Sequence, residues 1–241
     1  MKKKKLKMKN FLNLKVTKCI ENFVVRRILQ RRRIEGDQID LARLTHLLLR
    51  FGVAFLRCSV FYRRVGFVMS NSEVRYRKGF RTDGLFTIES GCLIDCYGDV
   101  GVIVGRNFKL GRNSVISVPG SYLSKGEGVV IGRNVGLGDF SYIGGEAIVE
   151  IGDNTISGQY LSIHPENHIF NKGQLFTESG TSKIGIKVGN NVWLGAKVTL
   201  LDGCSIGSNS IVAAGSVVKG EFPRNSIIAG VPARVIGSNG H

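Results

Sequence analysis

Two histidines stand four residues apart in the stretch from Ser162 to Phe170, which reads SIHPENHIF. A neutral imidazole, with a pKa of about 6.5, is the side chain that most often takes a proton from a weak nucleophile at neutral pH. The stretch therefore predicts a general base at His164 or His168, with Glu166 placed between them to orient an imidazole or contact a substrate. Two histidines are fewer than a three-histidine zinc site needs, so we expect no metal.

The chain around this stretch repeats every six residues. From Val188 to Val218 every sixth residue is aliphatic, and the same spacing holds in upstream blocks that begin at Val104, Ile131 and Ile151. This period fits neither an amphipathic helix nor an alternating strand. It is typical of a parallel β-helix, in which three hexapeptides make a coil of about 18 residues and the coils stack at roughly 4.8 Å. We expect the 32 glycines to supply the positive φ angles of the corners.

The repeat is lost after Ile163 and returns only between Ile184 and Val188. The residues in between include NKGQLFTESGTSK, which has no periodic aliphatic residue. An interruption of this length predicts a loop that leaves the solenoid, and loops on a rigid scaffold commonly carry function. Both histidines lie at the root of this loop.

The C-terminal third contains two longer motifs, GNNVWLGAKVTLLDGCSIGSNSIVAAGSVV and IIAGVPARVIG. With the hexapeptides they resemble the bacterial hexapeptide-repeat acyltransferases, in particular the branch of sugar and polysaccharide O-acetyltransferases. The resemblance covers roughly Gly84 to Gly237. It implies a left-handed coil, a homotrimer and acetyl-CoA as the donor, although left-handed parallel crossovers are otherwise rare.

The resemblance also implies roles for single residues. The residues assigned to the donor are Trp193, Gly195, Ala196, Ala213, Ala214, Lys219 and Arg234. The tryptophan would pack beside pantetheine, the alanines would offer backbone contacts, and the two cations would meet the CoA phosphates. A backbone N–H near Gly195 would hold the oxyanion. For the acceptor, the family uses an Asn or Asp one coil before the histidine, which indicates Asp139.

The family's base histidine stands in an Asn-His or His-Pro context, and this chain offers both, as Asn167-His168 and His164-Pro165. Counting forward from Ile151 by the family's 17 residues reaches His168. The preferred base is therefore His168, and His164 is then a substrate contact or a residue that supports the base.

The positive charge is concentrated near the N-terminus. Up to Arg33, thirteen Lys and Arg stand against one acidic residue, so this segment holds +12 of the formal net charge of +16. Arg43, Arg50, Arg57 and Arg64 follow at intervals of seven, on one face of a predicted helix. Two interpretations stay open: a helical cap on the first coil with a solvated tail, or contact with an anionic membrane, to which each basic residue adds about 1 kcal/mol. Nucleic acid is not an expected partner, because aromatic residues are not interleaved with the lysines.

We therefore predict an all-β solenoid: a left-handed parallel β-helix over residues 84–241 with a C-terminal extension, after a basic helical region over residues 1–83. The predicted function is acetyl-CoA-dependent O-acetylation of a sugar hydroxyl in a surface polysaccharide or its lipid-linked precursor. The alternatives are N-acetylation of an amino-sugar nucleotide and a non-catalytic, membrane-tethered solenoid scaffold. The basic start is followed by no apolar signal run, and Cys92 and Cys204 occupy inward positions as buried thiols, so we expect a cytoplasmic protein apposed to the inner membrane.

Overall fold

The structure of the chain is a computed structural model that describes residues 41–121, 124–170, 172–173, 175 and 179–240. The chain divides into two compact units, Met1–Leu47 and Leu48–His241. The basic segment up to Arg33, the side chain of Arg43, Cys19 and His241 lie outside the described residues.

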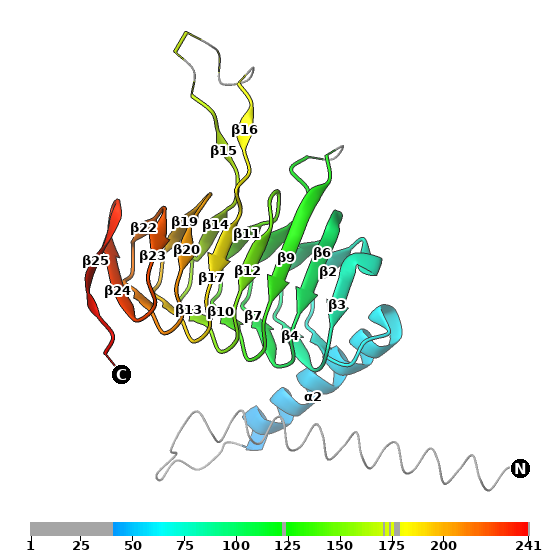
Figure 1. The fold of residues 1–241 in the computed structure, drawn as a ribbon. Helices are drawn as coiled ribbons and strands as arrows, with labels where there is room; N and C mark the ends of the chain where they lie inside the picture. The colour runs from blue at the N-terminus through cyan, green and yellow to red at the C-terminus, as the bar shows by residue number, and fades with distance from the viewer. Residues whose placement is uncertain (1–40, 122–123, 171, 174, 176–178, 241) are drawn as a thin grey trace, which may run out of the picture. The chain divides into compact units, whose positions relative to one another are not determined.

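In the second unit the chain winds through three parallel sheets in turn, as a β-helix (Figure 1). Sheet I contains β1 (Phe67–Val68), β4 (Phe86–Ile88), β7 (Phe108–Leu110), β10 (Gly136–Leu137), β13 (Ile156–Ser157), β18 (Trp193–Leu194), β21 (Ile211–Val212), β24 (Ser226–Gly230) and the antiparallel β25 (Ala233–Ser238). Sheet II contains β2 (Glu73–Arg75), β5 (Leu93–Asp95), β8 (Val115–Ser117), β11 (Tyr142–Gly144), β14 (Ser162–His164), β19 (Thr199–Leu201) and β22 (Val217–Val218). Sheet III contains β3 (Phe80–Thr82), β6 (Gly98–Val104), β9 (Gly126–Ile131), β12 (Val149–Ile151), β17 (Ile186–Val188), β20 (Ser205–Ile206) and β23 (Glu221–Phe222).

The coils differ in length, and the extra residues fall at one edge. Leu194 pairs with Val212, eighteen residues further on, which is the predicted coil length. Leu110 pairs with Leu137 across twenty-seven residues, and Ser157 pairs with Leu194 across thirty-seven. The additional residues lie at 118–125 and 165–185, where the chain passes from sheet II to sheet III. We call this the II/III edge, and the passage from sheet I to sheet II the I/II edge.

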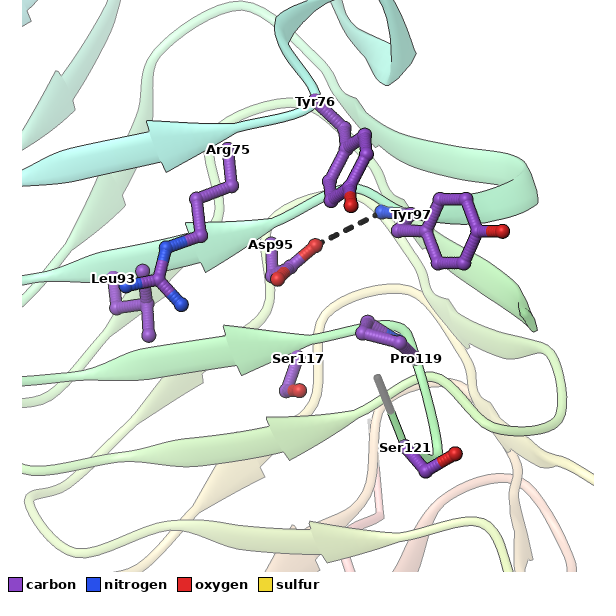
Figure 2. A pocket seen from close by; sticks show the side chains of 8 residues that line it. All are labelled: Arg75, Tyr76, Leu93, Asp95, Tyr97, Ser117, Pro119 and Ser121. Atoms are coloured by element: carbon purple, nitrogen blue, oxygen red, sulfur yellow. Dashed lines mark hydrogen bonds between the residues drawn. The ribbon is translucent and has the colours of Figure 1, made fainter. Parts of the chain in front are cut away.

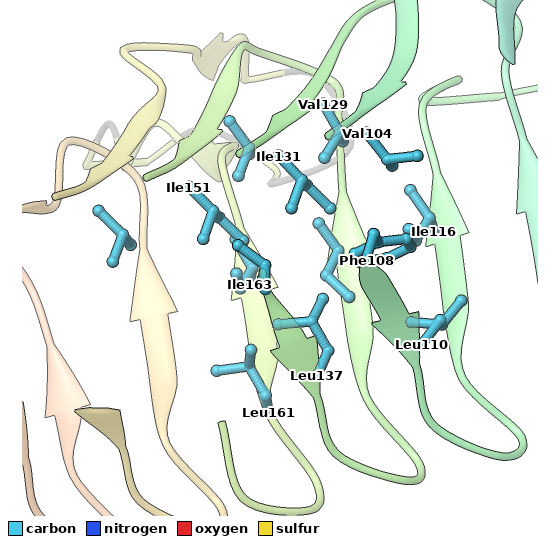
Figure 3. Packing of buried hydrophobic residues seen from close by; sticks show 14 of the residues in the cluster. Val104, Phe108, Leu110, Ile116, Val129, Ile131, Leu137, Ile151, Leu161 and Ile163 are labelled. Atoms are coloured by element: carbon cyan, nitrogen blue, oxygen red, sulfur yellow. The ribbon is translucent and has the colours of Figure 1, made fainter. Parts of the chain in front are cut away.

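The interior is filled by the residues of the six-residue pattern. Leu110, Ile116 and Ile163 are fully buried, and Leu137 is nearly so. Figure 3 shows these side chains stacked behind one another along the solenoid. Burial of an aliphatic side chain of this size contributes about 1.5–3 kcal/mol, so the repeat provides much of the cohesion between coils.

The predicted buried thiols are confirmed. Cys92 and Cys204 are free and almost fully buried. Burial raises the pKa of Cys204 to about 12, so its thiol stays protonated at neutral pH.

Asparagines make the turns from sheet III back to sheet I. Asn134 and Asn154 have φ angles of 57° and 60°, and Asn134 Nδ2 donates to Asn154 Oδ1 at 2.9 Å. The expectation that glycine supplies the positive φ is therefore wrong at these turns, because Asn tolerates that conformation and also links the coils. Gly132 is needed there for close approach, since a Cβ would lie 2.7 Å from the backbone N of Asp153 in the next coil. Glycine takes the positive φ at the II/III edge, as at Gly203 (φ 76°).

The first paired strand is β1, so the β-helix begins at Phe67, earlier than the expected start at Gly84. Phe80 fills the first coil where the next coil has Val102, and Phe86 of the second coil is followed by another aromatic residue, Phe108. The 3₁₀ turn Arg77–Gly79 also interrupts the six-residue spacing. These departures hide the repeat, and residues 67–83 belong to the β-helix instead of the helical region.

Arginines attach the N-terminal helix to the first coils. Helix α2 (Leu41–Arg57) continues into a π-helical turn, Cys58–Tyr62. Arg50 Nη2 donates to Glu89 Oε2 at 2.9 Å, and Arg57 donates to two carbonyl oxygens of the first coil at 3.1 Å each. Arg64 lies beyond the helix but also donates to a first-coil carbonyl, at 3.3 Å. These contacts support the cap interpretation for this segment.

The opposite face of this helical segment is apolar and exposed. Leu49, Val53, Leu56 and Val60 recur at helical spacing, and each exposes 63–68% of its surface. We call these four residues the apolar row. The inner face is also apolar, with Ala54 and Cys58 buried, whereas a surface helix normally has a polar outer face. Among the described residues, no helix has the length and apolar character needed to cross a bilayer.

Candidate active site

Strand β14 ends at His164, on the II/III edge where the long loop leaves the solenoid. Ile163 points into the interior and is fully buried, so the residue after it faces outward. Ser162 Oγ lies 2.7 Å from His164 Nε2. The ring of Tyr142, on the neighbouring strand β11, stacks on the imidazole with centroids 5.4 Å apart. These two contacts hold the imidazole in a defined orientation.

Partial burial lowers the pKa of His164 below its usual value, because desolvation disfavours the imidazolium ion. A lowered pKa keeps the ring neutral through neutral pH and able to accept a proton. When Nε2 carries the hydrogen and donates it to Ser162 Oγ, Nδ1 keeps a lone pair for an incoming proton. His164 is therefore arranged as a neutral base.

An acidic side chain lies at Gly144, on the strand next to that of His164, and a second one follows at Glu166. Gly144 is the register neighbour of His164, and a Cβ there would run into Glu146 Oε2 and lie 2.9 Å from Pro165 Cδ. Burial raises the pKa of Glu146, and the charge of Glu166 adds to the rise. Glu166 Oε2 itself lies 3.3 Å from Lys183 Nζ on the returning arm of the loop. The structure thus pairs Glu166 with a lysine across the loop root.

A buried aspartate, which the sequence analysis did not single out, anchors the return of the loop. Asp202 is 3% exposed. Its carboxylate accepts hydrogen bonds from Ser182 Oγ at 2.8 Å and from the N–H groups of Ile184 and Gly185 at 2.8 and 2.9 Å. Asp202 follows Leu201, the register partner of His164. The only sequence signal was an aspartate inside an otherwise apolar stretch, LLDGC.

The structure separates the two candidate histidines. His168 lies in β15 (Asn167–His168), which pairs with β16 (Thr181–Ser182) in a ribbon that projects from the solenoid (Figure 1). The side chains of His168 and His164 are both exposed. His164 stands on the solenoid itself, at the end of a strand that is paired on both sides.

Five predicted donor residues meet at the I/II edge. Gly195 and Ala196 follow β18, and Ala213 and Ala214 follow β21 in the next coil. The two turns are in close contact, since a Cβ at Gly195 would lie 2.5 Å from the backbone N of Ala214. Trp193 lies on the outer face of sheet I and is 53% exposed.

The remaining predicted donor contacts lie elsewhere. Lys219 follows β22 on the II/III edge, and its side chain is exposed. Arg234 lies in β25, where its Nη1 donates to the carbonyl of Ala233 at 2.8 Å.

The predicted oxyanion donor near Gly195 is already paired. The N–H of Gly195 donates to the Val212 carbonyl at 2.8 Å. Gly195 itself therefore cannot hold an oxyanion, because strand pairing uses its only donor.

Asp139 stands at the I/II edge, away from the edge that carries His164. Arg112 binds its carboxylate through Nε and Nη2, at 3.0 and 2.8 Å. Burial alone would raise the pKa of Asp139, but the hydrogen bonds and charge of Arg112 outweigh that effect and lower it. In this chain Asp139 links two successive coils, and it does not meet His164.

The family model described as bacterial transferase hexapeptide (six repeats) matches residues 185–220. A galactoside O-acetyltransferase of Escherichia coli (strain K12) is 36% identical over 132 residues, which are 53% of this chain and 62% of that protein. A second protein of that strain, named "Putative lipopolysaccharide biosynthesis O-acetyl transferase WbbJ", is 31% identical over 157 residues, which are 61% of this chain and 77% of that protein. The chain belongs to the bacterial hexapeptide-repeat acyltransferases. The family and the enzyme class predicted from the sequence are thus confirmed.

A solved structure supports the fold of this hexapeptide-repeat acyltransferase. A mutant of AntD, an N-acyltransferase from Bacillus cereus in complex with dTDP and coenzyme A, superposes with a TM-score of 0.51 over 73% of this chain and 83% of that chain. The two sequences are 16% identical, so the likeness concerns the fold alone. The fold class, a left-handed parallel β-helix, is confirmed. Within the described residues, no three His, Cys, Asp or Glu side chains are grouped to hold a metal ion.

We expect the imidazole resonance of His164 to titrate with a midpoint below 6.5, the ordinary pKa of histidine, because partial burial lowers the pKa of this side chain. An NMR titration of the full chain between about pH 5 and pH 8 measures this directly. The variants His164→Gln and His168→Gln assign the two signals, because each removes one resonance. A midpoint above 6.5 for His164 would contradict the desolvated, neutral base.

Proposed function

We propose that this acyltransferase uses acetyl-CoA to acetylate a sugar hydroxyl of a surface polysaccharide, such as O-antigen, capsule or exopolysaccharide, or of its lipid-linked precursor. The observation that carries the proposal is the oriented, partly desolvated His164 on the II/III edge. The names of two relatives support hydroxyl acceptors, since both are O-acetyl transferases. One of those names refers to lipopolysaccharide biosynthesis.

The proposed step needs one base and no covalent enzyme intermediate. The sugar hydroxyl gives its proton to the free nitrogen of His164 as its oxygen attacks the thioester carbonyl of acetyl-CoA. The tetrahedral intermediate collapses with loss of the CoA sulfur, which takes the proton back from the imidazolium. Ser162 and Tyr142 act on the ring alone, through the contacts that fix its orientation.

His164 is a better candidate for this base than His168. Its ring is held by two neighbours and partly desolvated, which favours a neutral imidazole in a fixed place. His168 stands on the ribbon, where its position depends on a single short antiparallel pairing with Thr181. General-base catalysis needs the base within hydrogen-bond reach of the acceptor, so a residue on the rigid scaffold suits the role.

The separation between His164 and the predicted donor residues at the I/II edge, here called the donor edge, favours a site shared between neighbouring chains. Leu201, the register partner of His164, is five residues from Ala196 across the corner at Lys197 (φ 59°), so the two are at most about 16 Å apart. Within one chain the predicted donor edge and the base are thus separated by the width of sheet II. A homotrimer that sets the I/II edge of one chain against the II/III edge of the next closes this gap. The exposed Trp193 and Ile156 on sheet I supply apolar surface for such packing or for pantetheine.

We expect His164→Ala to lower turnover at least about 100-fold while leaving acetyl-CoA binding intact, as loss of a general base should. The matched variant His168→Ala should keep turnover within about two-fold of the wild type. Steady-state kinetics with a hydroxyl sugar and calorimetric binding of acetyl-CoA measure the two effects. If His168→Ala is the inactive variant, the assignment is reversed. Transfer to an amino-sugar nucleotide alone would favour N-acetylation, and failure to bind acetyl-CoA would favour the scaffold alternative.

Mixing two inactive variants tests the shared site. His164→Ala removes the base, and Ala214→Tyr places a ring in the predicted donor edge. If neighbouring chains share the site, co-refolded equal mixtures should recover about a quarter of wild-type activity, the fraction of neighbour pairs with one intact base and one intact donor edge. Sedimentation of the wild type should give a trimer. An active monomer, or a mixture with no recovered activity, would contradict the shared site.

A position at the anionic cytoplasmic face of the membrane is supported by two features. The segment up to Arg33 carries a net charge of +12, and the apolar row is exposed on α2 and the turn after it. Basic residues attract an anionic surface, and an apolar helix face can enter the headgroup boundary. Such a position would raise the effective concentration of a lipid-linked acceptor.

We expect deletion of Met1 to Arg33 to abolish co-sedimentation with vesicles that contain anionic lipid, while acetyl transfer to a soluble sugar is retained. The double variant Leu49→Asn/Leu56→Asn should weaken sedimentation, and the control Ile236→Asn, at an exposed solenoid residue, should not. Wild-type binding should fall as salt shortens the Debye length from about 10 Å at 0.1 M to about 3 Å at 1 M. Equal sedimentation of full-length and truncated chains at low salt would remove the membrane proposal.

A further inference from the structure

A hollow of about 290 Å³ lies on the II/III edge, over the first three coils. Tyr76 and Tyr97 form its aromatic side, with ring centroids 4.7 Å apart and planes inclined by 33° (Figure 2). Its polar lining consists of Arg75, Asp95, Ser117 and Ser121. Asp95 is held in place because its Oδ1 accepts a hydrogen bond from the N–H of Tyr97 at 3.1 Å. The hollow therefore holds polar and aromatic groups in fixed positions.

This hollow shares a row of register positions with His164. Asp95 pairs with Ser117, and Ser117 pairs with Gly144. Ile143 pairs with Ile163, so Gly144 and His164, the residues that follow them, are the next pair in the same row. At roughly 4.8 Å per strand, Ser117 lies about 10 Å from the position of His164, and Asp95 about 14 Å. The row leads from the hollow to the proposed base.

A turn and two acidic side chains lie between the hollow and His164. Pro119 and Ser121 line the hollow, and they flank Gly120. A Cβ at Gly120 would lie 3.5 Å from Glu146 Cγ and 3.9 Å from Glu166 Oε2. The turn at one end of the hollow therefore rests against Glu146 and Glu166. At Gly144, the row position between Ser117 and His164, the carboxylate of Glu146 and Pro165 Cδ fill the space that a side chain would take.

The chemistry of the hollow matches a saccharide. A pyranose ring presents a C–H face that stacks on an aromatic ring, and its hydroxyl groups donate to a carboxylate and exchange hydrogen bonds with a serine hydroxyl. Tyr76, Tyr97, Asp95 and Ser117 provide these partners together. The backbone of Tyr76 has a φ of 49°, an unusual conformation for an aromatic residue, and it brings the ring against Tyr97.

We propose that the hollow is a subsite for an acceptor chain: it binds sugar units of an oligosaccharide or polysaccharide two to three coils away from the unit that is acetylated at His164. This inference rests on the proposed function and adds to it that the acceptor is a chain of several sugars. Subsite binding of remote units holds the reacting hydroxyl beside the base, which raises kcat/KM for long acceptors and leaves short ones unaffected.

The test compares acceptors of increasing length. The probes are the monosaccharide and the purified di-, tetra- and hexasaccharide fragments of the source organism's own surface polysaccharide after removal of its acetyl groups. For the wild type, kcat/KM should rise at least about ten-fold from the monosaccharide to the tetrasaccharide. Tyr97→Ala and Asp95→Asn should remove most of that gain and leave the monosaccharide value within about two-fold of the wild type.

Two controls separate binding from folding. Tyr97→Phe keeps the ring and should keep the gain with chain length. Asp153→Asn changes a half-buried carboxylate on another edge, where it pairs with Arg133, and should also keep the gain. Direct binding of the hexasaccharide to the His164→Ala variant, measured by saturation-transfer NMR, provides a readout without catalysis, and adding Tyr97→Ala to that variant should abolish the binding.

The outcomes distinguish the two proposals. If the monosaccharide is acetylated but chain length has no effect, and Tyr97→Ala binds the hexasaccharide as the parent does, the subsite is overturned and the proposed function stands. If no saccharide is acetylated, the proposed function fails, and the saturation-transfer measurement of hexasaccharide binding still tests the subsite. A change of oligomeric state in Tyr97→Ala or Asp95→Asn, measured by sedimentation, would identify this face as a contact between chains and also overturn the subsite.

Discussion

Each coil of the solenoid donates and accepts backbone hydrogen bonds with the next at the spacing of a β-ladder, roughly 4.8 Å. The bond from the Gly195 N–H to the Val212 carbonyl, at 2.8 Å, is one of many in this series. Stacking in register turns the sequence repeat into rows, because residues at the same position of successive coils lie one behind another. Ile116, Ile143 and Ile163 form such a row inside the prism, and each is fully buried. The row that contains Ser117 and His164 is its counterpart on the outer face.

The same stacking decides where the chain can depart from the repeat. An insertion inside a strand would break two ladders and displace a buried side chain, whereas an insertion at a corner disturbs neither. Closing a longer loop costs little, since each doubling of its length adds only about 0.6 kcal/mol. Both long insertions stand at the II/III edge, and the buried carboxylate of Asp202 closes the larger one against the scaffold. The proposed catalytic and acceptor groups therefore share an edge whose position is rigid and whose loops can vary.

The end of a stack exposes carbonyl oxygens that no further coil can pair. Arg57 donates to the carbonyls of Met69 and Ser72, at 3.1 Å each, and Arg64 to that of Phe80, at 3.3 Å. A guanidinium group suits this position because it supplies several donors on a long side chain. The helix also packs Phe51 and Phe55 against Phe67 of the first coil, so the apolar row stands on the face that is turned away from that coil. The exposed row from Leu49 to Val60 follows from how the first coil is capped.

The sequence by itself determined the β-helix and the loop at residues 165–185. An aliphatic residue at every sixth position is typical of a parallel β-helix, and the loss of that pattern indicates the loop. It did not predict the start at Phe67, where aromatic residues and a 3₁₀ turn replace the signal, nor the asparagines that take the positive φ at one set of turns. It named both histidines but preferred His168 by counting along the chain. Only the tertiary structure decided which of them stands on the scaffold, because the stacking of Tyr142 on His164 joins residues of different coils. The sequence did not predict the hollow for the same reason: its members come from separate coils, and only the register places two of them, Asp95 and Ser117, in one row with the base.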